Sequence, residues 1–297
     1  MYYLASAAAG AIIAVMVVQN GALADLTGLF GSTVLVHLGG LVFVVLCMFA
    51  RRVRLPRGRM SWYLYGGGAV GVASVVFTSY AFAHASVSAI TALALLGQSV
   101  YSLAIDHFGW FGLPRRPFRR EKLAGLAAIL AGIACILWLR AGPAGAGAPA
   151  ATLPAIFLAF LSGITVVTTR MLNSGLCERT GLLPSTLWNY ITGLTLSLLL
   201  LPAAGGAGQL VASPLSPNVF LYLGGVSGAV VVLFSSSIAP HISSLYMTIF
   251  MFVGQVFTGV LLDVFLTGAF SAGNAAGGIL VTLGLVLMMR ADAKNGA

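Results

Sequence analysis

Two stretches of the chain decide the fold: NGALADLTGLFGST over residues 20–33 and NSGLCERTGLLPST over residues 173–186. At this offset of 153, nine of the 22 positions from 20 to 41 are identical in the later segment. A second match, at an offset of 157, pairs 64–108 with 221–265 and keeps 15 of 45 residues. The matches include rare polar residues as well as leucines. They therefore indicate an internal duplication rather than the chance likeness of two apolar segments.

The composition restricts the class of protein. Of the 297 residues, 59% are hydrophobic and only 7% are charged, with a mean hydropathy of +1.02. Soluble domains carry about 25% charged residues, so the composition excludes a soluble enzyme, a nucleic-acid-binding protein and a disordered chain. The three cysteines, at 47, 135 and 177, show no metal-binding or redox spacing and are interpreted as reduced thiols.

Apolar runs long enough to cross a bilayer recur ten times. They cover residues 3–20, 31–50, 62–82, 86–106, 123–140, 152–172, 182–201, 218–239, 242–263 and 273–290. The sequence therefore predicts an all-α polytopic membrane protein with ten transmembrane helices. Cleavage of the first run as a signal peptide is the weaker alternative, because no lysine or arginine precedes that run.

The basic residues predict the orientation. With ten spans both termini share one side, and that side holds fourteen of the fifteen lysines and arginines, leaving only Arg140 opposite. This bias predicts a protein of the cytoplasmic (inner) membrane with both termini cytoplasmic. The net charge of +9 therefore needs no nucleic-acid partner, although the arginine-rich loops can contact anionic membrane lipid.

The duplication has a geometric consequence. Residues 1–145 and 146–297 form two repeats of five spans, and an odd number of spans makes the second repeat enter the membrane from the opposite side. The two halves should then form an inverted repeat about a pseudo-two-fold axis in the membrane plane. This plan is typical of secondary transporters, with the substrate site near the midplane.

Three segments of the first half resemble the YdcZ-type branch of the drug/metabolite transporter (DMT) superfamily. They are Gly97-Gln98, IDHFG at 105–109 and GLPRR at 112–116. The segment Asn20-x-x-Leu23 is similar to another signature of that family, and it recurs at Asn173. The resemblance implies a ten-helix, five-plus-five exporter of small organic solutes, without identifying the solute. The second half departs from it, since Val264 rather than histidine follows Asp263.

Gln98 and its repeat partner Gln255 are the sharpest candidates for binding substrate. At 1.5 Å per residue, Gln98 lies about 18 Å from one membrane face and about 12 Å from the other. Inversion gives Gln255 the mirrored depth, so both amides should lie near the midplane. A role in holding helix to helix carries equal weight, because a glycine precedes each glutamine and permits close approach.

A second group of candidates centres on His37, whose repeat partner is Tyr190, beside Trp188 and Asn189. Polar groups inside a span predict a functional site, and the aromatic rings suit an organic cation or a flat ring. The competing interpretations are a neutral imidazole bonded to a helix carbonyl, and aromatic anchoring at the lipid interface.

The remaining candidates have structural or gating roles. Asp106 and Asp263 should bond to backbone amides of the following turn or to a nearby arginine, with proton coupling as the alternative. His84 and His241 should lie in turns or gates. Asn20 and Asn173 should cap helix ends, with lining of the vestibule as the alternative. The glycine-rich segment at 66–71 matches a dinucleotide fingerprint, but inside an apolar run it indicates helix packing.

Together these patterns predict a secondary transporter that moves a small organic molecule by alternating access. No cofactor or metal is expected, and the partners are a small-molecule substrate and membrane lipid, with a homodimer left open. A lipid flippase on the same fold is the first alternative. A membrane-embedded enzyme is the second, although the acidic residues are scattered at span ends on both faces.

Overall fold

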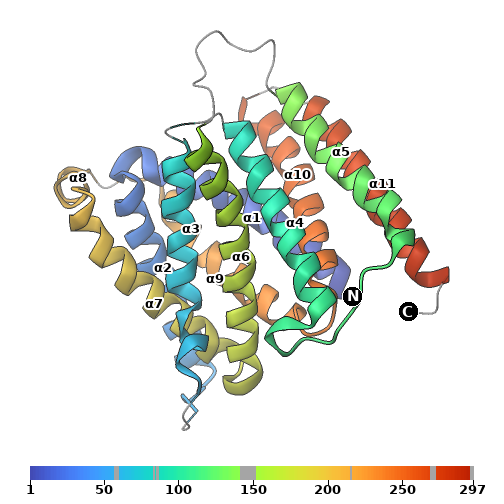
Figure 1. Cartoon of the computed structure of the whole chain (residues 1–297). Helices are drawn as coiled ribbons and strands as arrows, with labels where there is room; N and C mark the ends of the chain where they lie inside the picture. Colours follow the sequence, from blue (N-terminus) through green and yellow to red (C-terminus); the bar gives the residue numbers. More distant parts are fainter. Residues whose placement is uncertain are drawn as a thin grey trace. The chain divides into compact units, whose positions relative to one another are not determined.

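The computed structural model describes the chain apart from residues 57–59, 83, 85–86, 141–151, 215, 268–271 and 295–297. The described residues form helices and turns without a β-strand, which confirms the predicted all-α class (Figure 1). The α-helices are α1 (Tyr2–Thr27), α2 (Leu29–Ala50), α3 (Gly67–Phe82), α4 (Val87–Phe108), α5 (Leu123–Arg140), α6 (Leu153–Thr180), α7 (Leu182–Ala203), α8 (Ala207–Ala212), α9 (Gly224–Ile238), α10 (Ser244–Thr267) and α11 (Ala272–Lys294). Short 3₁₀ helices are η1 (Trp62–Gly66), η2 (Trp110–Gly112), η3 (Arg120–Lys122) and η4 (Val219–Leu223).

Many of these helices are apolar and long enough to cross a membrane. Within the described residues, seven helical segments meet both conditions. They are Tyr2–Thr27, Leu29–Ala50, Trp62–Ala81, Leu153–Thr180, Leu182–Ala203, Val219–Ile238 and Ser244–Leu262. The other predicted spans coincide with α4, α5 and α11, each of which includes or adjoins residues outside the described set.

Two helices are longer than the sequence predicts. The apolar runs at 3–20 and 152–172 become α1 and α6, which continue to Thr27 and Thr180. Each helix ends at a glycine with positive φ, Gly28 at 74° and Gly181 at 90°. Because L-residues rarely adopt this conformation, the glycines, rather than the earlier polar residues, end the helices and permit one-residue links to α2 and α7.

Contacts divide the described chain into two compact units. Unit 1 contains Met1–Ala11, Ser74–Val167 and Ile242–Ala297, and unit 2 contains Ile12–Ala73 and Thr168–His241. The boundary falls within α1, α3 and α6. The units do not coincide with the sequence halves 1–145 and 146–297, because helices of one half pack against helices of the other.

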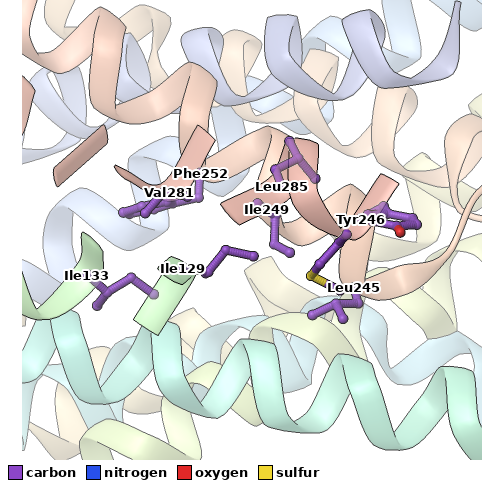
Figure 2. Close-up of a cluster of buried hydrophobic side chains, with 9 residues drawn as sticks. Ile129, Ile133, Leu245, Tyr246, Ile249, Phe252, Val281 and Leu285 are labelled. Carbon is purple, nitrogen blue, oxygen red and sulfur yellow. The ribbon is translucent and has the colours of Figure 1, made fainter. Parts of the chain in front are cut away.

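The core of unit 1 joins α5, α10 and α11. Figure 2 shows its side chains converging from these three helices. The cluster comprises Ile129, Ile133, Leu245, Tyr246, Ile249, Phe252, Val281, Leu285 and Met288. Small residues let α5 and α11 lie side by side (Figure 1). A Cβ added to Gly125 would lie 2.6 Å from the carbonyl oxygen of Gly284, and the reverse substitution gives the same distance.

The core of unit 2 is built around α2, which packs against both α7 and α9. Its buried cluster comprises Val44, Met48, Leu187, Tyr190 and Ala229. Gly40 faces the ring of Tyr190, whereas Gly193 faces the ring of His37. Residue 37 of α2 therefore lies beside residue 193 of α7, and residue 40 lies beside residue 190. Because the numbers rise along one helix as they fall along the other, the two helices run antiparallel.

Candidate functional site

Unit 2 contains a group of buried polar side chains, which we call the unit 2 polar core. It comprises Gln19, Arg170, Asn173, Asn189 and Tyr190, each no more than 8% exposed. These residues come from α1, α6 and α7. Burying an unpartnered polar group in an apolar interior costs free energy, so the partners of these groups decide what the core can do.

An amide pair joins α6 to α7 in this core. The Nδ2 of Asn173 donates to the Oδ1 of Asn189 at 2.8 Å. The start of α3 closes over the same pair, because a Cβ added to Gly67 would clash with the Oδ1 of Asn173. The sequence placed Asn173 at a helix end, and this is corrected: α6 continues to Thr180, so Asn173 lies inside the helix and bonds across helices.

His37 and Tyr190 lie together between α2 and α7, with ring centroids 5.8 Å apart. The hydroxyl of Tyr190 donates to the carbonyl of Gly225 at 3.1 Å. The Nδ1 of His37 lies 2.8 Å from the carbonyl oxygen of Thr33. Because a carbonyl only accepts, Nδ1 carries the hydrogen, and in the neutral ring Nε2 remains an acceptor. From the sequence, His37 could either bind substrate or form a neutral imidazole bonded to a helix carbonyl. The structure contains the bond to the carbonyl.

Trp188 packs in a different cluster from its neighbours in sequence. Its ring meets Tyr65 edge to face, with centroids 4.9 Å apart, and it lies against the apolar cluster that includes Leu172 and Leu176. Because successive helix residues point in directions about 100° apart, Asn189 and Tyr190 enter the polar core while Trp188 packs among apolar side chains.

Gln19 is a polar-core residue that the sequence reasoning missed. It is 2% exposed, and its Oε1 accepts a hydrogen bond from the hydroxyl of Ser227 at 2.8 Å, which links α1 to α9. The next residue, Asn20, lies within α1 and not at its predicted end, because the helix runs to Thr27. Its Oδ1 is buried without a hydrogen-bond partner in the described part of the chain.

Arg170 is the second residue that the sequence reasoning missed. It was counted among the basic residues on the cytoplasmic side, at the end of a span. In the structure it lies inside α6, ten residues before the helix ends at Thr180, and it is 8% exposed. The available signal was an arginine next to an unbroken apolar run, because charged residues within spans mark functional sites.

The two glutamines lie in unit 1, on α4 and α10, and both are half-buried. The glycines before them pack closely. A Cβ on Gly97 would clash with the carbonyl of Phe160, and a Cβ on Gly254 would clash with that of Ala7. The predicted lining is therefore divided: Gln98 and Gln255 belong to unit 1, whereas His37, Trp188, Asn189 and Tyr190 belong to unit 2.

Asp106 is buried at the end of α4, with 4% exposure. Its carboxylate accepts hydrogen bonds from the hydroxyl of Ser243 at 2.5 Å, and from the backbone N–H groups of Ser244 and Leu245 at 2.8 Å each. A carboxylate here caps the N-terminus of α10 and complements its dipole. The sequence instead predicts that this carboxylate bonds to backbone amides of the turn after Asp106 or to an arginine. The side chain of Asp263 lies outside the described residues.

The two turn histidines have the same local geometry. The Nδ1 atoms of His84 and His241 each lie 2.9 Å from the carbonyl oxygen four residues earlier, in Tyr80 and Ser237. Across the described positions, no group of three His, Cys, Asp or Glu side chains could hold a metal ion. The polar core instead offers amides, a phenol and a guanidinium, with the imidazole of His37 beside Tyr190. These groups suit reversible binding of a small solute by hydrogen bonds.

Comparisons with known proteins identify the fold and the family. One solved crystal structure, described only as that of a protein, has a TM-score of 0.71 and 17% sequence identity, covering 100% of this chain and 98% of the other. A search of curated proteins gives no match. The family described as "Putative inner membrane exporter, YdcZ" matches residues 1–135 and 154–291. With its long apolar helices, the chain is a multi-pass membrane protein that belongs to the YdcZ family of inner membrane exporters.

Proposed function

We propose that the protein is a secondary transporter that moves a small organic solute across the cytoplasmic membrane by alternating access. In this proposal ten spans form two inverted five-helix repeats, with both termini in the cytoplasm. The exporter family supports the transport class. One observation supports the inverted plan: residues that are equivalent in the two sequence repeats make equivalent contacts.

The first pair of such contacts lies in unit 1. The close approach of Gly97 to the carbonyl of Phe160 is repeated by Gly254 and Ala7. These residues are related by the sequence offsets of 157 and 153 that the duplication predicts. A helix of each half thus packs on a helix of the other half in the same manner. This is expected when two copies of one five-helix repeat pack through equivalent surfaces.

The helices α5 and α11 give a second pair. Gly125 lies against the carbonyl of Gly284, and Gly132 lies against that of Gly277 with a Cβ-to-oxygen distance of 2.8 Å. The sequence aligns Gly125 with Gly277 and Gly132 with Gly284. Under a two-fold operation each contact is therefore the image of the other, the signature of an isologous interface. This reciprocity supports a pseudo-two-fold axis passing between α5 and α11.

Unit 2 repeats the pattern around the polar core. The Oδ1 of Asn173 abuts Gly67, and the Oδ1 of the equivalent Asn20 abuts Gly224. The antiparallel α2 and α7 are also repeat partners, as inversion requires. We propose His37, Asn189, Tyr190 and Trp188 as substrate contacts within this unit. Gln98 and Gln255 are proposed separately, as substrate contacts within unit 1.

We further propose that Asp106 acts as a gate. Its bonds to the start of α10 hold the end of α4 against the beginning of a helix from the other half. The repeat aligns Asp263 with Asp106 and Ser86 with Ser243. Alternating access would open and close the latch that Asp106 forms with the start of α10.

Solute counterflow in proteoliposomes tests the proposed function. Purified protein is reconstituted and loaded with members of a solute panel, and exchange of each labelled solute is measured. We expect saturable exchange that falls in Gln98→Ala and Gln255→Ala but not in Gln209→Ala, a control at an exposed glutamine. Exchange of no solute would contradict the proposal. Translocation of a fluorescent phospholipid instead would favour the flippase alternative.

A further inference from the structure

A buried arginine is the feature of unit 2 that the family and the repeat leave unexplained. Among the residues whose exposure is described, Arg170 is the one lysine or arginine that is buried. Its guanidinium stays charged in proteins, and a charge inside a membrane-spanning helix is expensive. The repeat partner of Arg170 is Val17, so the arginine belongs to one half alone and is not part of the symmetric scaffold.

The position of Arg170 on α6 places it on the helix face that carries Asn173. Residues three and four apart share a helix face, so Arg170 lies in one row with Asn173 and Ser174. Asn173 bonds to Asn189 of α7, and the hydroxyl of Ser174 donates to the carbonyl of Ser236 on α9 at 3.5 Å. Arg170 therefore begins the row of α6 that faces α7 and α9.

One buried hydroxyl accompanies this row. The Oγ of Ser236, a residue only 1% exposed, is buried without a hydrogen-bond partner among the described residues. Ser236 is the residue whose carbonyl meets Ser174. An unmade hydrogen bond at a buried hydroxyl costs about 1–3 kcal/mol, which a polar ligand at this position would recover.

We propose that Arg170 binds a carboxylate group of the transported solute, with the hydroxyl of Ser236 donating to the same group. The inference rests on the proposed transport function and names its substrate class: a monoanionic or zwitterionic carboxylate. Arg170 already has an interaction within the protein. A guanidinium carries five N–H donors, and its planar form fits a carboxylate in bidentate geometry. A single buried cation suits one negative charge better than two.

Matched pairs of probes test this inference on the purified full-length protein. The pairs are benzoate with benzamide and lactate with lactamide, which differ mainly in charge. Thermal unfolding in detergent is followed as each probe is titrated, since a ligand that binds the folded state raises the melting temperature. We expect at least one carboxylate to stabilise the wild-type protein well beyond its amide.

The variants distinguish whether Arg170 binds the carboxylate or only supports the fold. Arg170→Gln should abolish the preference for carboxylate over amide, and Arg170→Lys should weaken carboxylate binding roughly tenfold by losing the bidentate fork. Ser236→Ala, which keeps the charge of Arg170, should weaken carboxylate binding by about three- to tenfold, the loss of one hydrogen bond. Arg179→Gln, at an exposed position of the same helix, should change nothing.

Several results would overturn the inference. They are equal stabilisation by acid and amide, no stabilisation by any carboxylate, or a carboxylate preference that persists in Arg170→Gln. If Arg170→Gln does not fold, unchanged carboxylate binding in both Arg170→Lys and Ser236→Ala has the same meaning. Phosphate stabilising the protein in place of carboxylates would also contradict it. Arg170-dependent binding without counterflow would refute transport alone, whereas counterflow of neutral solutes that is unaffected by Arg170→Gln would refute this inference alone.

Discussion

A single added methyl group tests whether the glycines of α10 hold the two halves together. Gly254 and Gly259 lie on the same helix but in different surroundings. A Cβ on Gly254 would sit 2.7 Å from the carbonyl carbon of Ala7 and 3.0 Å from its Cα, whereas a Cβ on Gly259 would meet nothing within 4 Å. The variants Gly254→Ala and Gly259→Ala therefore add the same group to a packed and to an open position.

The expected difference follows from these distances. Carbon atoms pack best about 3.5–4.0 Å apart, so α1 and α10 must separate by about 1 Å in Gly254→Ala. Overpacking of this kind costs about 1–3 kcal/mol. Both variants also gain about 1 kcal/mol from replacing glycine in a helix. Because this gain cancels in the comparison, Gly254→Ala should be less stable than Gly259→Ala by about 1–3 kcal/mol.

Unfolding of both variants in the same detergent measures this difference. The equivalent substitution Gly97→Ala should behave like Gly254→Ala, because a Cβ there would clash with the carbonyl of Phe160. Should Gly254→Ala prove at least as stable as Gly259→Ala, the close approach of α1 to α10 could not be a determinant of stability. The packing argument would then fail.

Two further substitutions test single hydrogen-bonded groups by thermal unfolding. Asp106→Asn removes charge-assisted bonds to the start of α10, so it should cost about 1.5–3 kcal/mol, whereas Asp25→Asn at an exposed position should cost little; equal effects would exclude a capping role. Tyr190→Phe leaves the carbonyl of Gly225 without its donor and should destabilise by about 1–3 kcal/mol, whereas Tyr63→Phe, at a residue 48% exposed, should be nearly neutral. A neutral Tyr190→Phe would show that its hydroxyl adds nothing to the stability of unit 2.

Local features of the fold could be predicted from the sequence because they depend on neighbouring residues. Apolar runs predict helices, and Gly28 and Gly181 fall where the helix-to-helix links occur. The apolar runs alone predict ends for α1 and α6 that are too early, at residues 20 and 172. In the structure, α1 and α6 continue past the amides of Asn20 and Asn173, and the Asn173 amide bonds across helices.

Partnerships between helices could not be predicted in this way. Helical spacing shows which residues share a face but not which helix covers that face. Asp106 was expected to find its partners nearby, yet its donors lie 137 to 139 residues further along the chain. Arg170 was assigned to a membrane face because positive charges are counted by loop, whereas its burial depends on how α6 packs within unit 2.

The two halves should cross the membrane in opposite directions, and cysteine labelling from each side distinguishes this arrangement from a parallel one. Asp25 and Glu178 are repeat partners, both exposed, near the ends of α1 and α6. In a variant with the native cysteines replaced by serine, Asp25→Cys and Glu178→Cys are each exposed to a membrane-impermeant maleimide in intact cells and in inverted vesicles. The account predicts that Asp25→Cys is labelled from outside and Glu178→Cys only from the cytoplasmic side. Labelling of both from the same side would contradict it.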